Sequence, residues 1–275
     1  MRIVTTTSVF PPCYPVENAI DRLSKIGYSG LDLALDYCID SSNFPFMTEN
    51  WSQWGRSLGE KAKECGVAFT HSHAPGDVSD RSPIFFRCFD LCNVMGIPYI
   101  VVHPIFRNDA CSIIEREDEF ISVNTSAILP LLEIAERNHV KILSENLLWG
   151  ASKDPLVIAR LVKEVSSPFF GWCFDTGHAN CFDISPSILL KADVCPDSLH
   201  IHDNTGGDDT HAIPGDGSVD WKVFLQTLHD IDYQGELVLE AHHQSLACKD
   251  EARDVVLQTL YLRATKMRAY YNSLF

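Results

Sequence analysis

The 275-residue sequence has no apolar run long enough to cross a bilayer. Stretches such as YIVVHPIF fall far short of the roughly 20 residues that a transmembrane helix needs. The first residues, MRIVTTTSVF, show neither the apolar core nor the small-residue cleavage site of a signal peptide. No linker rich in glycine, serine or proline divides the chain. We therefore expect one cytoplasmic globular domain over residues 1–275, without a membrane partner.

Paired cysteines are also lacking. The ten cysteines are scattered along the chain and form no Cys-x-x-Cys motif. Disulfide frameworks are typical of short secreted chains, and free cysteine is among the most buried residue types. We expect reduced thiols that mostly fill the core.

Positive charge is scarce. The chain has 22 lysines and arginines against 37 aspartates and glutamates, which gives a formal net charge of −15. Proteins that bind the phosphate backbone of nucleic acids usually present a basic surface. The composition therefore disfavours a nucleic-acid partner, but it leaves open a local site whose positive charge comes from metal ions.

Short apolar, β-branched runs alternate with longer stretches that have helical periodicity. Repeated βα units imply parallel strands with right-handed crossovers, and eight units in 275 residues fit an α/β fold, the (β/α)8 TIM barrel. The alternative is a doubly wound open sheet, but TTTSVFPPCYP lacks the glycine-rich loop usual after its first strand. The predicted strands are residues 3–8, 30–36, 67–73, 99–104, 141–146, 169–178, 198–203 and 236–242.

Helix boundaries are marked at several connections. Gly27 and Gly66 are stop signals after segments with helical periodicity. Asp154 is a plausible N-cap, with Pro155 at the first helical position. The last helix is expected from about residue 249 to 271.

Ionisable residues gather at the C-terminal ends of the predicted strands, where TIM barrels build their active sites. Carboxylates crowded there would repel one another and be costly to desolvate unless a divalent cation bound them. Mixed histidine and carboxylate donors favour Zn²⁺ or Mn²⁺ over Ca²⁺. The strand-end donors are His71, His73, His103, Glu145, Asp175, His178, His200, His202, Asp203, Glu240, His242 and His243.

The densest group of donors lies in HIHDNTGGDDTHAIPGD, residues 200–216, which has three histidines and four aspartates. We expect His200 to point into the barrel mouth as a ligand. His202 is expected on the opposite face of the strand, where it would be structural or contact a ligand side chain, and Asp203 is expected to contact a ligand side chain or the substrate. Asp209 and His211 would then bind a metal, bind the substrate, or order the loop.

Four motifs carry a resemblance to a known family. DTGHAN (175–180), HIHDN (200–204), THAIPGDGSVDW (210–221) and ELVLE (236–240) resemble the xylose-isomerase-like TIM barrel superfamily. That group includes sugar phosphate isomerases and epimerases, inosose-pathway enzymes, ketose 3-epimerases and metal-dependent apurinic-site endonucleases. The resemblance spans all eight strands, but the motifs do not choose the reaction.

The epimerase branch implies one divalent ion held by residues from strands 5 to 8, which match Glu145, Asp175, His200 and Glu240. In that branch one glutamate removes the proton next to a carbonyl and the other returns it, through a metal-stabilised enediolate. Glu145 and Glu240 are therefore the implied catalytic residues, and His178 matches a substrate-binding histidine. The implied function is a metal-dependent isomerase or epimerase of a sugar, sugar phosphate or polyol.

The endonuclease branch implies further metal ligands, which match His73, His103, His178, Asp209 and His211. With the four ligands above, the chain offers nine candidates, enough for one to three ions. The site carboxylates, Asp209 included, contribute a charge of −4, so one ion leaves −2 and three leave +2. The first value suits a neutral sugar and the second a phosphate ester, so a multi-zinc phosphoesterase of the apurinic-endonuclease type is the alternative.

The loops favour a small carbohydrate over DNA. Residues 37–50 and 201–221 have no lysine or arginine, which a duplex-binding face needs. Gly76 and Asp77 stand where the endonuclease branch has an intercalating wedge. Aromatic residues in the loops, with Phe10 and Trp149 among them, suit a small-molecule pocket.

Departures from the ketose 3-epimerase pattern concern the substrate. Gly206 and Ala151 stand where those enzymes have a substrate-contacting arginine and glutamate, so the resemblance does not extend to a free ketohexose substrate. Members of the superfamily often form dimers or tetramers, which makes a homo-oligomer an expectation of the resemblance.

Overall fold

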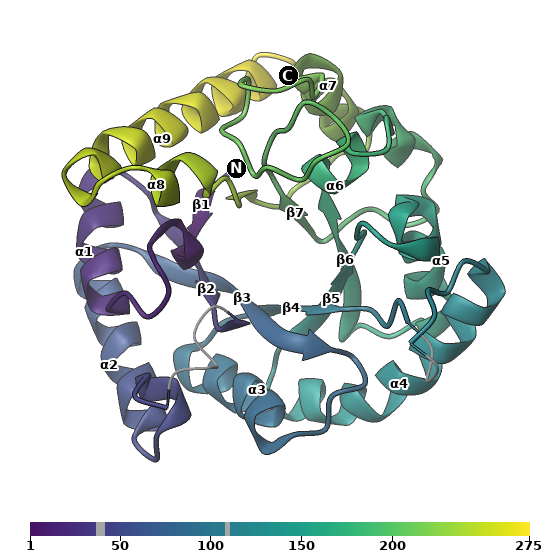
Figure 1. The fold of residues 1–275 in the computed structure, drawn as a ribbon, viewed down its shortest axis with the longest axis horizontal. Coiled ribbons are helices and arrows are strands. Elements are labelled where there is room, and N and C mark those ends of the chain that lie inside the picture. Colours follow the sequence, from purple (N-terminus) through teal and green to yellow (C-terminus); the bar gives the residue numbers. More distant parts are fainter. Residues whose placement is uncertain (37–41, 108–110) are drawn as a thin grey trace.

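The computed structural model describes residues 1–36, 42–107 and 111–275. Figure 1 looks down a barrel of parallel strands, paired in the order β7-β6-β5-β4-β3-β2-β1-β8. Ile201 closes the barrel, since its N–H donates to Val238 O at 2.8 Å and its carbonyl accepts from Glu240 N at 3.0 Å. The predicted TIM barrel is confirmed. The strands are β1 Ile3–Thr6, β2 Gly30–Ala34, β3 Ala68–Asp77, β4 Tyr99–His103, β5 Lys141–Glu145, β6 Phe170–Asp175, β7 Ser198–His200 and β8 Leu237–Leu239.

The helices form a ring around the strands (Figure 1). The predicted signals are confirmed at their ends: Gly27 has φ 119° after the first helix, and the Asp154 side chain accepts from Leu156 N at 2.9 Å. The α-helices are α1 Val16–Ile26, α2 Trp51–Glu64, α3 Pro83–Met95, α4 Glu117–Arg137, α5 Pro155–Val165, α6 Thr176–Asn180, α7 Trp221–Asp230, α8 His243–Ala247 and α9 Asp250–Asn272. Short 3₁₀ turns are η1 Thr7–Val9, η3 Pro45–Met47, η4 Gly150–Lys153 and η5 Pro186–Lys191.

All the strands except β3 are shorter than predicted, and the difference matters most at β7 and β8. β7 and β8 end at His200 and Leu239, so the polar residues beyond them lie in loops at the barrel mouth. The strands are buried on both faces because helices cover the outside and side chains fill the inside. A polar layer also lies inside the barrel, where His71 is hydrogen-bonded to Ser198 Oγ at 2.8 Å and to Thr70 Oγ1 at 3.0 Å.

The nine cysteines within the described residues are all free, as the sequence predicts. Among these residues, no helix combines the length and the apolar character that crossing a membrane would need.

Candidate metal centre

Four side chains meet at the mouth of the barrel because parallel strands end on the same side. Glu145, Asp175 and His200 are the last residues of β5, β6 and β7, and Glu240 directly follows β8. His200 Nδ1 lies 2.6 Å from Glu145 Oε2, 3.5 Å from Glu240 Oε2 and 4.0 Å from Asp175 Oδ2. The four residues that the sequence predicts as primary ligands therefore form one cluster, here called the primary group.

The primary group has polar atoms that lack partners. Glu145 Oε2 and both ring nitrogens of His200 are buried and make no hydrogen bond, although two of these atoms lie only 2.6 Å apart. Buried polar atoms are rarely left unsatisfied, so atoms that converge without bonding need a common partner. Three carboxylates and an imidazole suit a divalent ion such as Zn²⁺ or Mn²⁺, and the residues present fit such an ion.

His73 and His103 form a second group of donors with Glu145. His103 Nε2 lies 2.9 Å from Glu145 Oε1 and 3.0 Å from His73 Nε2, and His73 Nδ1 lies 3.7 Å from Glu240 Oε1. One donor atom each of His73, His103 and Glu145 lies within 4.8 Å of the others, which is compact enough to hold an ion. The structure therefore brings both predicted histidines to the primary group.

A third group surrounds Asp209 in the loop after β7, and we call it the loop group. Asp209 Oδ2 lies 3.2 Å from His178 Nε2 and 2.9 Å from His211 Nε2, and Asp209 Oδ1 lies 3.6 Å from His202 Nδ1. The expectation that His202 faces away from the site is wrong. Side chains two residues apart in an extended chain share a face, so His202 follows the direction of His200.

The charges of these groups shift the pKa values of the histidines. Burial by itself lowers the pKa of His178, but the carboxylates of Asp175 and Asp209 outweigh burial and raise it to about 10. The same balance raises the pKa of His73 to about 9 beside Glu240, and that of His211 to about 9 beside Asp209. Burial disfavours charge on Glu145, yet neighbouring His200 and His103 hold its pKa well below the usual range. The carboxylates therefore attract cations strongly.

A cavity of about 270 Å³ opens above the ligands, which is room for a small molecule. Asp175 and His200 lie beneath it with no exposed surface. The residues that line the cavity are Ser8, Ala34, Asp36, His73, His103, Glu145, His178, His211, Glu240 and His242.

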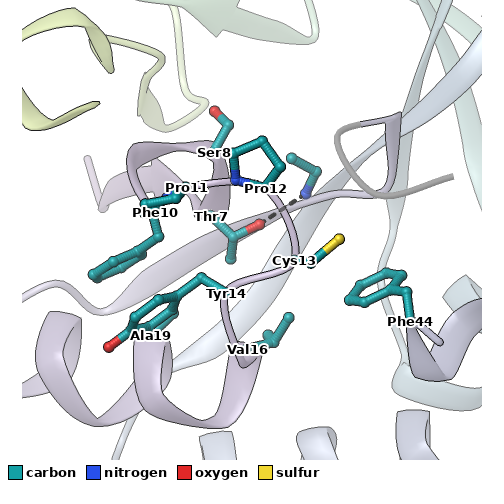
Figure 2. Close-up of a pocket in the computed structure, with 11 residues that line it drawn as sticks. Thr7, Ser8, Phe10, Pro11, Pro12, Cys13, Tyr14, Val16, Ala19 and Phe44 are labelled. Atoms are coloured by element: carbon teal, nitrogen blue, oxygen red, sulfur yellow. Dashed lines mark hydrogen bonds between the residues drawn. The ribbon is translucent and has the colours of Figure 1, made fainter. Parts of the chain in front are cut away.

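Phe10 lies in a smaller pocket next to this cavity. Figure 2 shows this pocket, where Thr7 Oγ1 accepts a hydrogen bond of 3.0 Å from Ala34 N. Ser8 and Ala34 line both the pocket and the cavity, so the two adjoin. Its volume of about 20 Å³ holds one water molecule or a methyl group. Phe10 is buried and stacks on Tyr14 at 4.5 Å.

Two predicted substrate contacts lie elsewhere. Asp203 is fully buried, and its two carboxylate oxygens accept four hydrogen bonds of 2.8–3.1 Å from three backbone N–H groups and the Trp221 indole. It therefore orders the loop rather than lining the cavity. Trp149 is 38% exposed and stacks on Phe106 at 4.7 Å, and it does not line the cavity either.

Two acidic residues of the site were missed in the sequence. Asp32 on β2 is buried with both carboxylate oxygens lacking hydrogen bonds, and burial raises its pKa to about 6. Asp36 follows β2, lines the cavity and has a pKa raised by burial. Their signal was the alternation in GLDLALD, which directs every second side chain to the barrel interior.

Known proteins resemble this chain in sequence or in fold. The uncharacterized protein y4fM of Sinorhizobium fredii is 32% identical over 162 residues, which cover 55% of this chain and 49% of that protein. The chain thus spans about half the length of the curated relatives it matches. The structure of the IOLI protein with a binding zinc atom has a TM-score of 0.76 and 17% identity, and covers 100% of this chain and 99% of that chain.

The structure of D-psicose 3-epimerase with D-tagatose, from Clostridium cellulolyticum H10, has a TM-score of 0.74 and 16% identity, and covers 97% of this chain and 99% of that chain. A family model described as xylose isomerase-like TIM barrel matches residues 20–262, nearly the whole barrel. The chain therefore belongs to the xylose isomerase-like TIM barrel family.

Proposed function

We propose that this protein is a divalent-metal-dependent isomerase or epimerase that acts on a sugar, sugar phosphate or polyol. One observation carries the proposal: two glutamates from different strands meet at one histidine and line one cavity. Glu145 lies 2.6 Å and Glu240 3.5 Å from His200 Nδ1. The solved structures of similar fold, named for bound zinc and for a ketose epimerase with its sugar, support the proposal.

The two glutamates would share the proton transfer. A carboxylate can take a proton from the carbon next to a carbonyl, and a second carboxylate on the other face can deliver one. The neighbouring histidines hold the pKa values of both Glu145 and Glu240 well below the usual range, so both are ionised in the metal-free protein. Zn²⁺ or Mn²⁺ held by the primary group would polarise the substrate oxygens.

Other residues at the cavity would bind the rest of the substrate. Asp36 and His178 line the cavity with polar atoms and would bind hydroxyl groups. The carboxylates and imidazoles around the cavity suit a polyhydroxylated ligand, which presents both donors and acceptors.

A second candidate is a multi-metal phosphoesterase of the apurinic-endonuclease type. The group of His73, His103 and Glu145 and the loop group favour it, since each could hold a further ion. The missing basic residues in segments 37–50 and 201–221 disfavour a duplex substrate.

The test is a search for proton exchange in D₂O. The metal-loaded protein is incubated with ketoses, aldoses, their phosphates and inositol derivatives, and deuterium incorporation beside the carbonyl is followed by NMR. We expect exchange with at least one compound, its loss in the double variant Glu145→Gln/Glu240→Gln, and its retention in the control His139→Asn, whose side chain is exposed. Cleavage of an abasic duplex at low salt, without exchange in any compound, would establish the second candidate instead.

A further inference from the structure

We propose that His202 is a positioning residue that couples the primary group to the loop between β7 and α7. Its imidazole lies between a primary ligand, Asp175, and two residues of that loop, Asp209 and His211. The proposal concerns the binding of metal and the order of the loop, so it does not depend on which reaction the protein catalyses.

One edge of the imidazole holds Asp175. His202 Nε2 lies 3.1 Å from both carboxylate oxygens of Asp175, so an Nε2–H donor bonds the carboxylate symmetrically. Asp175 Oδ1 also accepts from His178 N at 2.7 Å. Hydrogen bonds to a ligating carboxylate fix its orientation, and losing such an outer partner usually weakens metal binding about 10- to 100-fold.

The other side of the imidazole supports the loop. The rings of His202 and His211 stack with centroids 3.8 Å apart and planes 13° apart. His211 has φ 46°, a left-handed conformation that is strained for a residue with a side chain and persists only where its surroundings hold it. His202 Nδ1 lies 3.6 Å from Asp209 Oδ1, and both atoms are buried without a hydrogen bond.

His202 Nδ1 and Asp209 Oδ1 explain how the primary group and the loop would be coupled. With the proton on Nε2, Nδ1 and the Asp209 oxygen are both acceptors and repel each other. A cation bound by the loop group removes that repulsion and so favours both the loop position and the tautomer that holds Asp175. Metal binding by the primary group and the ordered position of the loop would therefore stabilise each other.

The chain is built to hold this ring in place. Thr176 Oγ1 bonds the backbone of His202 on both sides, at 3.2 Å to its N–H and 2.9 Å to its carbonyl. A Cβ atom at Gly177 would lie 2.0 Å from His202 Cε1, so any side chain at this position would collide with the imidazole. Gly177, the glycine of the motif DTGHAN, therefore leaves the space that the His202 imidazole occupies.

The contacts with His202 matter for the tip of the loop, because the base of the loop is held separately. Asp203 anchors the base of the loop with its four hydrogen bonds, but the tip turns at Gly206 and Gly207, with φ 86° and 78°. Asp209 and His211 follow that turn. His178 Nε2 also lies 3.2 Å from Asp209 Oδ2, and His211 Nδ1 lies 2.9 Å from Glu240 O, so removing the support of His202 would loosen this tip without releasing it.

The experiment separates the two contacts with a pair of variants. His202→Phe keeps a ring to stack on His211 but loses the bond to Asp175, and His202→Gln keeps an N–H donor but loses the stack. We expect His202→Phe to weaken the tightest Zn²⁺ or Mn²⁺ site about 10- to 100-fold. We expect His202→Gln to raise hydrogen exchange in residues 205–211 at least about tenfold, with a smaller effect on metal affinity.

Controls identify the site and the mechanism. Metal affinity is measured by chelator-competition titration, in which Glu240→Gln marks the primary site, and His139→Asn, an exposed position away from the site, should change neither readout. Gly177→Ala should change both, since it displaces the ring without touching His202 chemically. If His202→Phe binds metal as tightly as the unmodified chain, or if Gly177→Ala leaves both readouts unchanged while near-ultraviolet circular dichroism shows a native fold, the proposal is overturned.

Discussion

Paired substitution of the two glutamates tests the proposed proton transfer most directly. Glu145→Gln and Glu240→Gln keep the size of each side chain and an oxygen ligand, but the amide cannot take up a proton. Each glutamate lies within 3.5 Å of His200 Nδ1, so each change removes one base at one side of the same ligand. Loss of a general base costs about 10²- to 10⁴-fold in rate, and a 10³-fold loss corresponds to about 4 kcal/mol of barrier.

The assay distinguishes the two faces of the substrate. Once a substrate is known, deuterium wash-in from D₂O is measured separately for both epimers, at saturating metal and with metal content verified. Each variant should lose net epimerisation, because that reaction needs both bases. Glu145→Gln should still exchange the proton of one epimer and Glu240→Gln that of the other. Equal loss of exchange from both epimers in each fully metal-loaded variant would refute the division of roles between the two faces.

Three further results are expected. Zinc binding to the metal-free protein should release protons at pH 7, because the raised pKa values of His73, His178 and His211 (about 9, 10 and 9) leave these imidazoles protonated until a metal displaces the protons. The apparent affinity should then rise with pH up to about 10, where the last of these imidazoles has lost its proton, and calorimetry in two buffers of different ionisation enthalpy should show a buffer-dependent heat. Asp203→Ala should lower the free energy of unfolding by about 3 kcal/mol, since four buried donors lose their acceptor, and urea denaturation of the metal-free protein measures the change. Ala34→Val, at the boundary between the cavity and the Phe10 pocket, should raise KM roughly tenfold with unchanged metal content; an unchanged KM would show that the substrate does not reach this boundary.

Topology predicts that the residues of the primary group converge, while the family resemblance selects these four among the strand-end donors. Once eight alternating βα units indicate a barrel, the last residues of successive strands must meet at one end, whatever the loops do. Glu145, Asp175 and His200 close their strands, and Glu240 follows its strand by one residue. The approach of the three carboxylates to within 4.0 Å of His200 Nδ1 needs no knowledge of loop structure.

The roles of Asp203, Asp32 and His202 depend on loop conformation or on which face of a strand each side chain points to. Asp203 directly follows two ligand-like histidines, yet its partners Gly215, Val219 and Trp221 come from the far end of the loop, and no local pattern predicts that return. Asp32 and His202 could have been assigned from parity alone, since every second residue of a barrel strand faces inward. A one-residue shift reverses the face to which a side chain points, whereas His200 and His202 are two residues apart and share a face, so the expectation for His202 is wrong.

The choice of cations at the site follows from its charges. The described residues that line the cavity include several carboxylates and imidazoles but no lysine or arginine. A fixed guanidinium or ammonium group there would neutralise the glutamates permanently and exclude a metal by repulsion. Imidazoles instead carry a positive charge that is lost with the proton, and the neighbouring carboxylates raise the pKa values of His178 and His73. A divalent ion bound by these residues would therefore displace protons from the imidazoles, so its binding would depend on both pH and metal concentration.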